Sequence, residues 1–135
     1  MAPEQRRLAI LRLCEEALTV WEQNHSSPSK YQESVTGTMQ NLDIGLPREA
    51  LEAVLALSDA ADIAVRYREP IVALQDMDLA LSTNAEFAYY AIYNAFRRYA
   101  LNLNIEEALV VNQALSALPS AVRARALLAA TSGAA

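Results

Sequence analysis

Apolar residues recur three or four positions apart over most of the chain, as they do along one face of an α-helix. The first such series lies between Pro3, which suits the first turn of a helix, and the polar segment "NHSSPS" at residues 24–29, which ends it. The sequence therefore predicts a first helix whose apolar stripe is made of Leu8, Leu11, Cys14 (or Glu15 at that turn), Leu18 and Trp21.

The middle of the chain predicts further helices that are separated by glycine and proline. Ser27, before Pro28, can cap a helix that extends through residues 31–42. Gly45 is expected to follow its end, because glycine readily takes the left-handed conformation found there. Pro47 is expected to begin a helix that continues to Glu69, and Pro70 to stop or kink it, since proline has no N–H to donate. Residues 70–82 are then expected to form another helix. The apolar stripe predicted over residues 31–42 is Tyr31, Val35, Met39 and Leu42.

In the last third of the chain, capping residues indicate where helices start. Thr83 or Asn84 can cap a helix that runs to about residue 103. Asn104 and Glu107 have the spacing of a capping box, which predicts a helix start for "IEEALVVNQALSAL". Pro119 ends that helix, and one more helix is predicted after residue 120.

These elements define the expected architecture. No segment has the alternating pattern of a strand, and no linker is long enough to divide the chain. We therefore predict an all-α fold in which residues 1–135 form a single compact domain, an irregular helical bundle of six to seven helices joined by short loops.

Composition indicates where in the cell such a protein would be found and which ligands it is not expected to bind. A chain of 135 residues, of which 53% are apolar, can bury a core without metal or disulfide staples. Cys14 is the only cysteine, so the chain lacks the disulfides typical of oxidising compartments. The first residues do not have the pattern of a secretory signal, and no apolar run approaches the ~20 residues of a membrane span. We expect a cytoplasmic protein that does not bind membranes. The net charge of −5 argues against a nucleic-acid binder, whose affinity depends on clustered cations.

Acidic residues concentrate in the middle third. From Asp43 to Glu86 there are nine acidic residues and three arginines. Each acid taken alone is expected to lie on a solvated face, but together they form an electronegative region suited to steering a cationic partner. The nine are Asp43, Glu49, Glu52, Asp59, Asp62, Glu69, Asp76, Asp78 and Glu86.

No catalytic or cofactor signature is present. His25 is the only histidine and cannot be paired with Cys14 from spacing alone, and two N or S donors are too few for zinc. Aspartates one turn apart, such as Asp59 and Asp62, are more typical of a solvated helix face than of a magnesium or calcium site. No phosphate loop, nucleophile elbow or zincin motif appears. We therefore predict no catalytic residue, no cofactor and no metal, and an enzyme is disfavoured.

Six of the nine aromatic residues lie in "EFAYYAIYNAFRRYA", residues 86–100. At helical spacing one face of this segment is expected to meet the core; it comprises Tyr89, Ile92, Tyr93, Phe96, Ala100 and Leu103. The other face comprises Phe87, Tyr90, Ala91, Asn94, Arg97, Arg98 and Leu101. A helix with aromatic residues on both faces is either central in the domain or half-buried with an interface on its back. Because arginine is hard to bury and Tyr with Arg is enriched at binding hot spots, we favour the interface; for Asn94 we also expect a buried amide that ties helices together.

The sequence therefore predicts a protein whose role is to bind another protein. The sharpest hypothesis consistent with the charge is a bacterial immunity or antitoxin protein that neutralises a basic partner. A homodimeric helical adaptor or assembly chaperone is one alternative, and a small helical enzyme or ligand-binding bundle with an internal Tyr/Asn/Asp pocket is another. The predicted partner-binding residues are Phe87, Tyr90, Asn94, Arg97, Arg98, Asp59, Asp62, Asp76 and Asp78.

Overall fold

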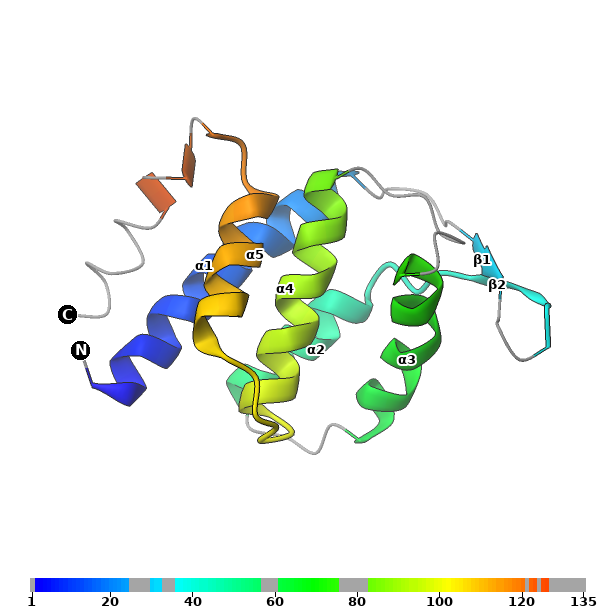
Figure 1. Ribbon diagram of the computed structural model, residues 1–135, viewed down its shortest axis with the longest axis horizontal. Helices are drawn as coiled ribbons and strands as arrows, with labels where there is room; N and C mark the ends of the chain where they lie inside the picture. Colours follow the sequence, from blue (N-terminus) through cyan, green and yellow to red (C-terminus); the bar gives the residue numbers. More distant parts are fainter. Residues whose placement is uncertain are drawn as a thin grey trace.

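A computed structural model describes the chain over residues 2–24, 30–32, 36–56, 61–75, 83–120, 122–123 and 125–126. Five α-helices lie in these ranges: α1 (Pro3–Asn24), α2 (Leu46–Ala56), α3 (Ala61–Gln75), α4 (Thr83–Tyr99) and α5 (Glu107–Ala117) (Figure 1). Two short strands, β1 (Lys30–Gln32) and β2 (Met39–Asn41), pair antiparallel. The prediction of an all-α fold is confirmed, whereas the predicted number of six to seven helices is too high for the part of the chain described.

Helix α4 is the element around which the others pack. It lies between α5 on one side and α2 and α3 on the other, with α1 behind it (Figure 1), and it contacts each of these four helices. Every residue from 84 to 100 is buried or partly buried. The aromatic segment is therefore central in this structure rather than packed on one face alone.

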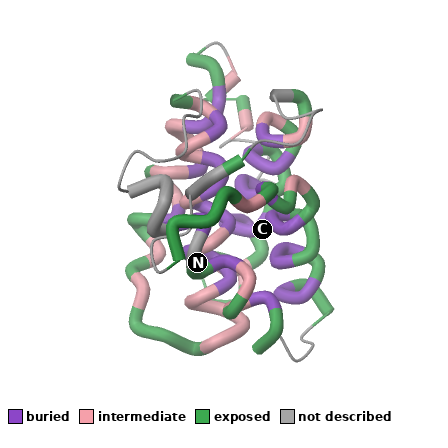
Figure 2. Tube along the Cα trace, turned by 90° about the vertical axis from the view of Figure 1, so that its right-hand side faces the viewer, coloured by how far each residue is buried: buried purple, intermediate pink, exposed green. Residues whose placement is uncertain are grey.

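The buried side chains of all five helices join in one apolar cluster. Its largest fully buried members are Trp21 from α1, Tyr67 from α3, and Tyr89 and Phe96 from α4. Figure 2 shows buried positions recurring between exposed ones along the helices, as amphipathic packing requires. The apolar stripe predicted for α1 is confirmed at Leu11, Cys14, Leu18 and Trp21, whereas Leu8 remains exposed.

Four aromatic rings form a continuous chain through this cluster. The ring centroids of Trp21 and Tyr89 lie 4.9 Å apart, those of Tyr67 and Tyr89 4.7 Å, and those of Tyr67 and Tyr93 4.8 Å. Such tilted and stacked pairs contribute roughly 0.5–1.5 kcal/mol each beyond the area they bury. The chain of rings therefore fixes α1 and α3 against α4.

The prediction of a helix over residues 31–42 is wrong. Strands β1 and β2 occupy this part of the chain, with Lys30 opposite Asn41 and Gln32 opposite Met39. Between them Gly37 has a φ of 72°, which interrupts helical geometry, and the threonines on either side are β-branched and poor helix formers. Gly45 does not follow a helix; it precedes α2, where its N–H donates to the Asp43 carboxylate at 3.1 Å.

The predicted continuous helix from Pro47 to Glu69 is two helices in the structure. Helix α2 ends at Ala56 and α3 begins at Ala61, and residues 57–60 between them lie outside the described residues. Pro70 neither ends α3 nor begins a new helix, because α3 continues through it to Gln75. The proline ring is buried, so packing against the core offsets the lost backbone hydrogen bond.

Helix α4 ends at Tyr99, earlier than predicted. Two backbone hydrogen bonds that span more than the four residues of an α-helical turn end it. They run from the Leu101 N–H to the Phe96 carbonyl at 3.2 Å and from the Leu103 N–H to the Arg97 carbonyl at 3.0 Å. Asn102 takes the left-handed conformation with a φ of 57°, which asparagine tolerates better than most residues.

The start of α5 also differs from the prediction. Its N-cap is Glu106, whose side chain makes no capping hydrogen bond, so the predicted capping box of Asn104 and Glu107 does not form. His25 and most of the segment predicted as a helix after residue 120 lie outside the described residues. Within the described ranges no helix is both long enough and apolar enough to cross a membrane.

The environment of Cys14 leads to a prediction about its reactivity. Burial, and secondarily the negative charge of Glu15, raise the pKa of its thiol to about 12. Because the thiolate is the nucleophile, a thiol reagent at pH 8 should label the folded protein about 1,000-fold more slowly than the unfolded chain. Mass spectrometry of samples with and without denaturant measures both rates. Equal rates would show that Cys14 is accessible in the fold.

The left-handed residue at the end of α4 leads to a second prediction. Asn102→Val should lower the free energy of unfolding by roughly 1–2 kcal/mol, because a β-branched side chain clashes with the backbone at positive φ. Asn102→Gly is the matched control and should leave stability nearly unchanged. Urea unfolding followed by circular dichroism compares the two variants, and equal losses would contradict the assigned conformation.

Candidate functional site

Three carboxylates converge on one arginine of α3. The Arg66 guanidinium lies 2.7 Å from a Glu49 oxygen, 3.1 Å from an Asp43 oxygen and 2.9 Å from an Asp62 oxygen. The three acids come from α2, from the turn before α2 and from α3 itself. Hydrogen bonding to Glu49 is the main cause that raises the pKa of Arg66 further above its usual value. One positive charge among three negative ones leaves this cluster with an excess of two negative charges.

A second group of ion pairs is centred on Arg48, the residue before Glu49 in α2. Arg48 donates from Nε to Glu22 at 2.6 Å and from Nη2 to Glu22 at 2.5 Å, and it lies 3.6 Å from Glu52. The hydrogen bonds from Arg48 lower the pKa of the Glu22 carboxyl. We call the two groups together the acidic surface; it contains five carboxylates and two guanidiniums, which are Glu22, Asp43, Glu49, Glu52, Asp62, Arg48 and Arg66.

The acidic surface contains one of the four predicted aspartates. Asp62 lies in it with its side chain 81% exposed. Asp59, Asp76 and Asp78 lie outside the described residues. The sequence predicted an electronegative middle third, but it could not show that Arg48 and Arg66 lie among these acids and hold them in place.

The residues predicted for the outer face of α4 differ in how far they are buried. Phe87 and Tyr90 are half-buried and pack against the core cluster. Arg97 is partly exposed, with its guanidinium carbon 5.2 Å from the centroid of the Tyr93 ring. Ala91 was assigned to the outer face and is fully buried, whereas Leu103 was assigned to the core and is 44% exposed. Assigning the residues of α4 to one buried and one exposed face is inaccurate here, because four helices pack around α4.

Asn94 is the buried amide that we expected. It is 6% exposed, and its Nδ2 donates to Gln113 Oε1 of α5 at 2.8 Å. Arg97 Nη1 donates to the Asn94 Oδ1 at 3.4 Å. Asn94 therefore joins α4 to α5, and its side chain is covered in this conformation.

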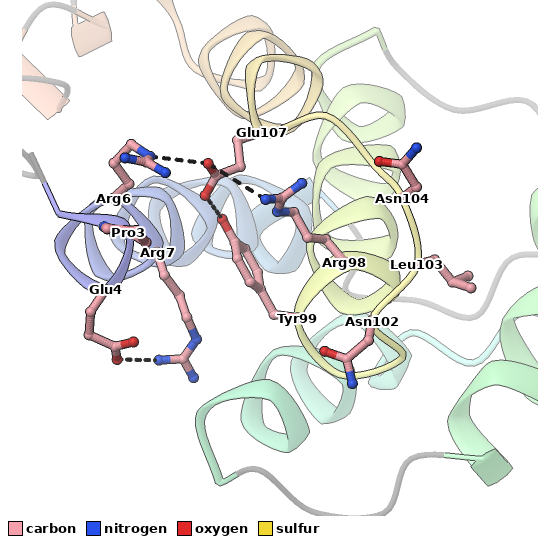
Figure 3. Close-up of a pocket in the computed structure, with 10 residues that line it drawn as sticks. All are labelled: Pro3, Glu4, Arg6, Arg7, Arg98, Tyr99, Asn102, Leu103, Asn104 and Glu107. Carbon is pink, nitrogen blue, oxygen red and sulfur yellow. Dashed lines mark hydrogen bonds and ion pairs between the residues drawn. The ribbon is translucent and has the colours of Figure 1, made fainter.

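Arg98, the remaining predicted residue, lies in a pocket where α1, α4 and α5 meet (Figure 3). The pocket has a volume of about 580 Å³. We call it the arginine pocket because three arginines line it, two from α1 and one from α4. Its lining residues are Pro3, Glu4, Arg6, Arg7, Arg98, Tyr99, Asn102, Leu103, Asn104 and Glu107.

Glu107 is the central carboxylate of the arginine pocket. It accepts hydrogen bonds from the Tyr99 hydroxyl at 2.7 Å and from Arg6 Nε at 3.2 Å, and Arg98 Nη2 lies 3.8 Å away (Figure 3). Burial opposes its ionisation, but the hydrogen bonds from Tyr99 and Arg6 and the charges of Arg98 and Arg6 outweigh it and lower the pKa of Glu107. Glu107 is therefore ionised at neutral pH.

Tyr99 connects the charged groups of the pocket. Its ring centroid lies 5.9 Å from the guanidinium carbon of Arg7 and 5.8 Å from that of Arg98, within the range of cation–π attraction. Burial, followed by the hydrogen bond to Glu107, raises the pKa of Tyr99, so its hydroxyl stays protonated and donates. Arg7 also donates to Glu4 at 3.1 Å and to the Val54 carbonyl of α2 at 3.4 Å.

Sequence reasoning missed this pocket for a physical reason. Arg6 and Glu107 are 101 positions apart, and no local pattern indicates that the helices carrying them meet. The sequence assigned Glu107 to a capping box, although its carboxylate instead pairs with α1 and α4. The one available signal was "RRYALNLNIEE", in which arginines at a helix end are followed by two acids after a short loop.

No protein-family model, curated protein or solved structure matches this chain. Within the ranges described, no three His, Cys, Asp or Glu side chains are grouped so that they could hold a metal ion.

Truncations on the two sides of α4 test its placement. Phe96→Ala should lower the free energy of unfolding by about 3–5 kcal/mol, because it leaves a cavity where a fully buried ring stood. Tyr90→Ala removes a half-buried ring and should cost about 1–2 kcal/mol. Denaturant unfolding measures both values. If Tyr90→Ala is as damaging as Phe96→Ala, the outward side of α4 is buried more deeply than this structure shows.

Proposed function

We propose that this protein acts by binding a basic partner protein, as an immunity or antitoxin protein neutralises a toxin. The observation that supports this most directly is the acidic surface, where three carboxylates from separate segments surround Arg66 within hydrogen-bond distance. The excess negative charge lies on exposed side chains that are available to a cationic partner.

The two arginines of the acidic surface hold its carboxylates in fixed positions. Arg66 holds Glu49 through two nitrogens, at 2.7 and 3.3 Å, and Arg48 holds Glu22 through two as well. Carboxylates fixed in this way lose less side-chain freedom when a partner binds. Each arginine pairs with more than one carboxylate, and such networks can contribute to folding stability, but the acids outnumber the arginines and their excess charge is left for recognition.

Charge of this kind acts mainly on the rate of association. A negative surface attracts a positive partner before contact, which raises the on-rate and makes it depend on salt. The partly buried Phe87, Tyr90 and Arg97 of α4 form a second part of the proposed contact surface, since Tyr and Arg supply binding anchors. Asn94 and Arg98 are better explained by their contacts with α5 and with the chain leading to it.

The test begins with affinity capture from the native host and identification of the partner by mass spectrometry. We expect a partner with a basic isoelectric point. Asp62→Asn combined with Glu49→Gln should lower the on-rate about tenfold at low salt, and less at high salt, when association is followed by surface plasmon resonance.

Glu15→Gln combined with Glu16→Gln is the matched control. It removes the same number of charges from exposed positions of α1 outside the acidic surface, so the on-rate should change little. Thermal melting establishes that both double variants are folded. An acidic partner, or an on-rate unaffected by salt and by the Asp62/Glu49 change, would rule out the proposed mode of binding.

A further inference from the structure

We propose that the arginine pocket binds a small organic anion through a carboxylate or phosphate group. This inference rests on side chains other than those of the acidic surface and does not depend on the proposed partner protein. It is carried by the shape of the pocket, its local charge and the way its guanidiniums are held.

The pocket has the size of a small-molecule site, and its lining is mainly polar and charged. Its volume of about 580 Å³ lies within the usual range for such sites, roughly 300–1,000 Å³. Three separate parts of the chain form it: the start of α1, the end of α4 with the following loop, and the start of α5 (Figure 3). Asn102 and Asn104 of that loop also line the pocket, and an amide can both donate to and accept from a ligand.

The charge of the pocket is opposite to that of the protein. The whole chain has a net charge of −5, whereas the pocket is lined by three arginines and two glutamates. The local excess is therefore positive. Arginine presents a planar fork of N–H groups that fits the two oxygens of a carboxylate or phosphate.

Glu107 shows how the pocket holds an oxyanion. This carboxylate comes from the chain itself and is bound by the Tyr99 hydroxyl and Arg6, with Arg98 nearby. It neutralises only part of the positive charge, and Arg98 has five N–H groups, more than its contacts with the Ile105 carbonyl and Glu107 use. A second oxyanion can therefore bind beside Glu107, and Glu107 should weaken that binding by repulsion.

The guanidiniums are positioned before any ligand arrives. The Tyr99 ring lies 5.9 Å from the Arg7 guanidinium carbon and 5.8 Å from that of Arg98, and Arg98 also donates to the Ile105 carbonyl. Arg7 is tied to the Val54 carbonyl at 3.4 Å. Donors held in place lose little freedom on binding, which favours a ligand as small as one organic anion.

The experiment is isothermal titration calorimetry in a buffer without carboxylate or phosphate. Citrate serves as the carboxylate probe and adenosine monophosphate as the phosphate probe, so the stronger binder identifies which group the pocket prefers. We expect saturable binding of at least one probe, with a Kd below about 1 mM.

Three variants assign that binding to the pocket. Arg6→Gln should weaken it about tenfold or more, since it removes a charged donor at an exposed position that can change without loss of the fold. Arg12→Gln is the matched control, because Arg12 is an exposed arginine of the same helix that does not line the pocket, and it should bind like the unchanged protein. Glu107→Gln should strengthen binding several-fold, because it removes the competing charge and keeps an oxygen that can accept from Tyr99.

The Glu107→Gln result separates a binding site from a purely structural network. If the network only joined helices, this change would lower thermal stability and would not strengthen the binding of either probe. The proposal is overturned if neither probe binds saturably at up to about 10 mM, or if Arg6→Gln and Arg12→Gln bind alike. Binding of the partner protein should be unaffected by Arg6→Gln, so failure of one proposal does not decide the other.

Discussion

The contact of Tyr89 with Trp21 on one side and Tyr67 on the other is the interaction on which the rest of the structure depends. Tyr89 belongs to α4, Trp21 to α1 and Tyr67 to α3, so two ring contacts fix three helices. All three side chains are fully buried, and the Tyr67 hydroxyl donates to the Tyr89 carbonyl at 3.4 Å. Trp21 Nε1 donates to the Ile44 carbonyl at 2.8 Å, which also sets the position of the turn that precedes α2.

Once α4 is central, its polar groups need partners from the helices that cover it. Helix α5 supplies them at three levels. Asn84 donates to the Ala117 carbonyl at 2.9 Å near the start of α4, Asn94 pairs with Gln113 in the middle, and Tyr99 donates to Glu107 at the end. The two helices are therefore antiparallel and joined along their length. The arginine pocket forms at the last of these levels, where the start of α1 also arrives.

Much of the helical framework could be predicted from sequence, because helix starts, stops and apolar spacing are local properties. The stripe of α1 from Leu11 to Trp21 and the buried amide of Asn94 are examples. The failures have non-local causes. Pro70 stays inside α3 because the core receives its ring, and Tyr93 stacks on Tyr67, a residue 26 positions away in the sequence. The same limit hid the arginine pocket, since the separation of Arg6 and Glu107 in sequence gives no sign of their contact.

The two proposed sites show why net charge is a weak guide to what an acidic protein binds. Screening limits the reach of a charge to about 8 Å at physiological ionic strength, so a ligand inside a pocket interacts mainly with the groups that line it. A large cationic partner instead encounters the whole acidic surface during its approach.

Helix α2 touches both proposed sites, through Arg48 and Glu49 at its start and through the Val54 carbonyl that accepts from Arg7. Coupling between them would require α2 to have two arrangements with different affinities for each ligand. Helix α2 buries Leu46, Leu51 and Val54 in the shared core, and it is tied to α1 and α3 by ion pairs. These contacts favour a single arrangement, in which the two proposed ligands, a basic protein and a small anion, would bind independently.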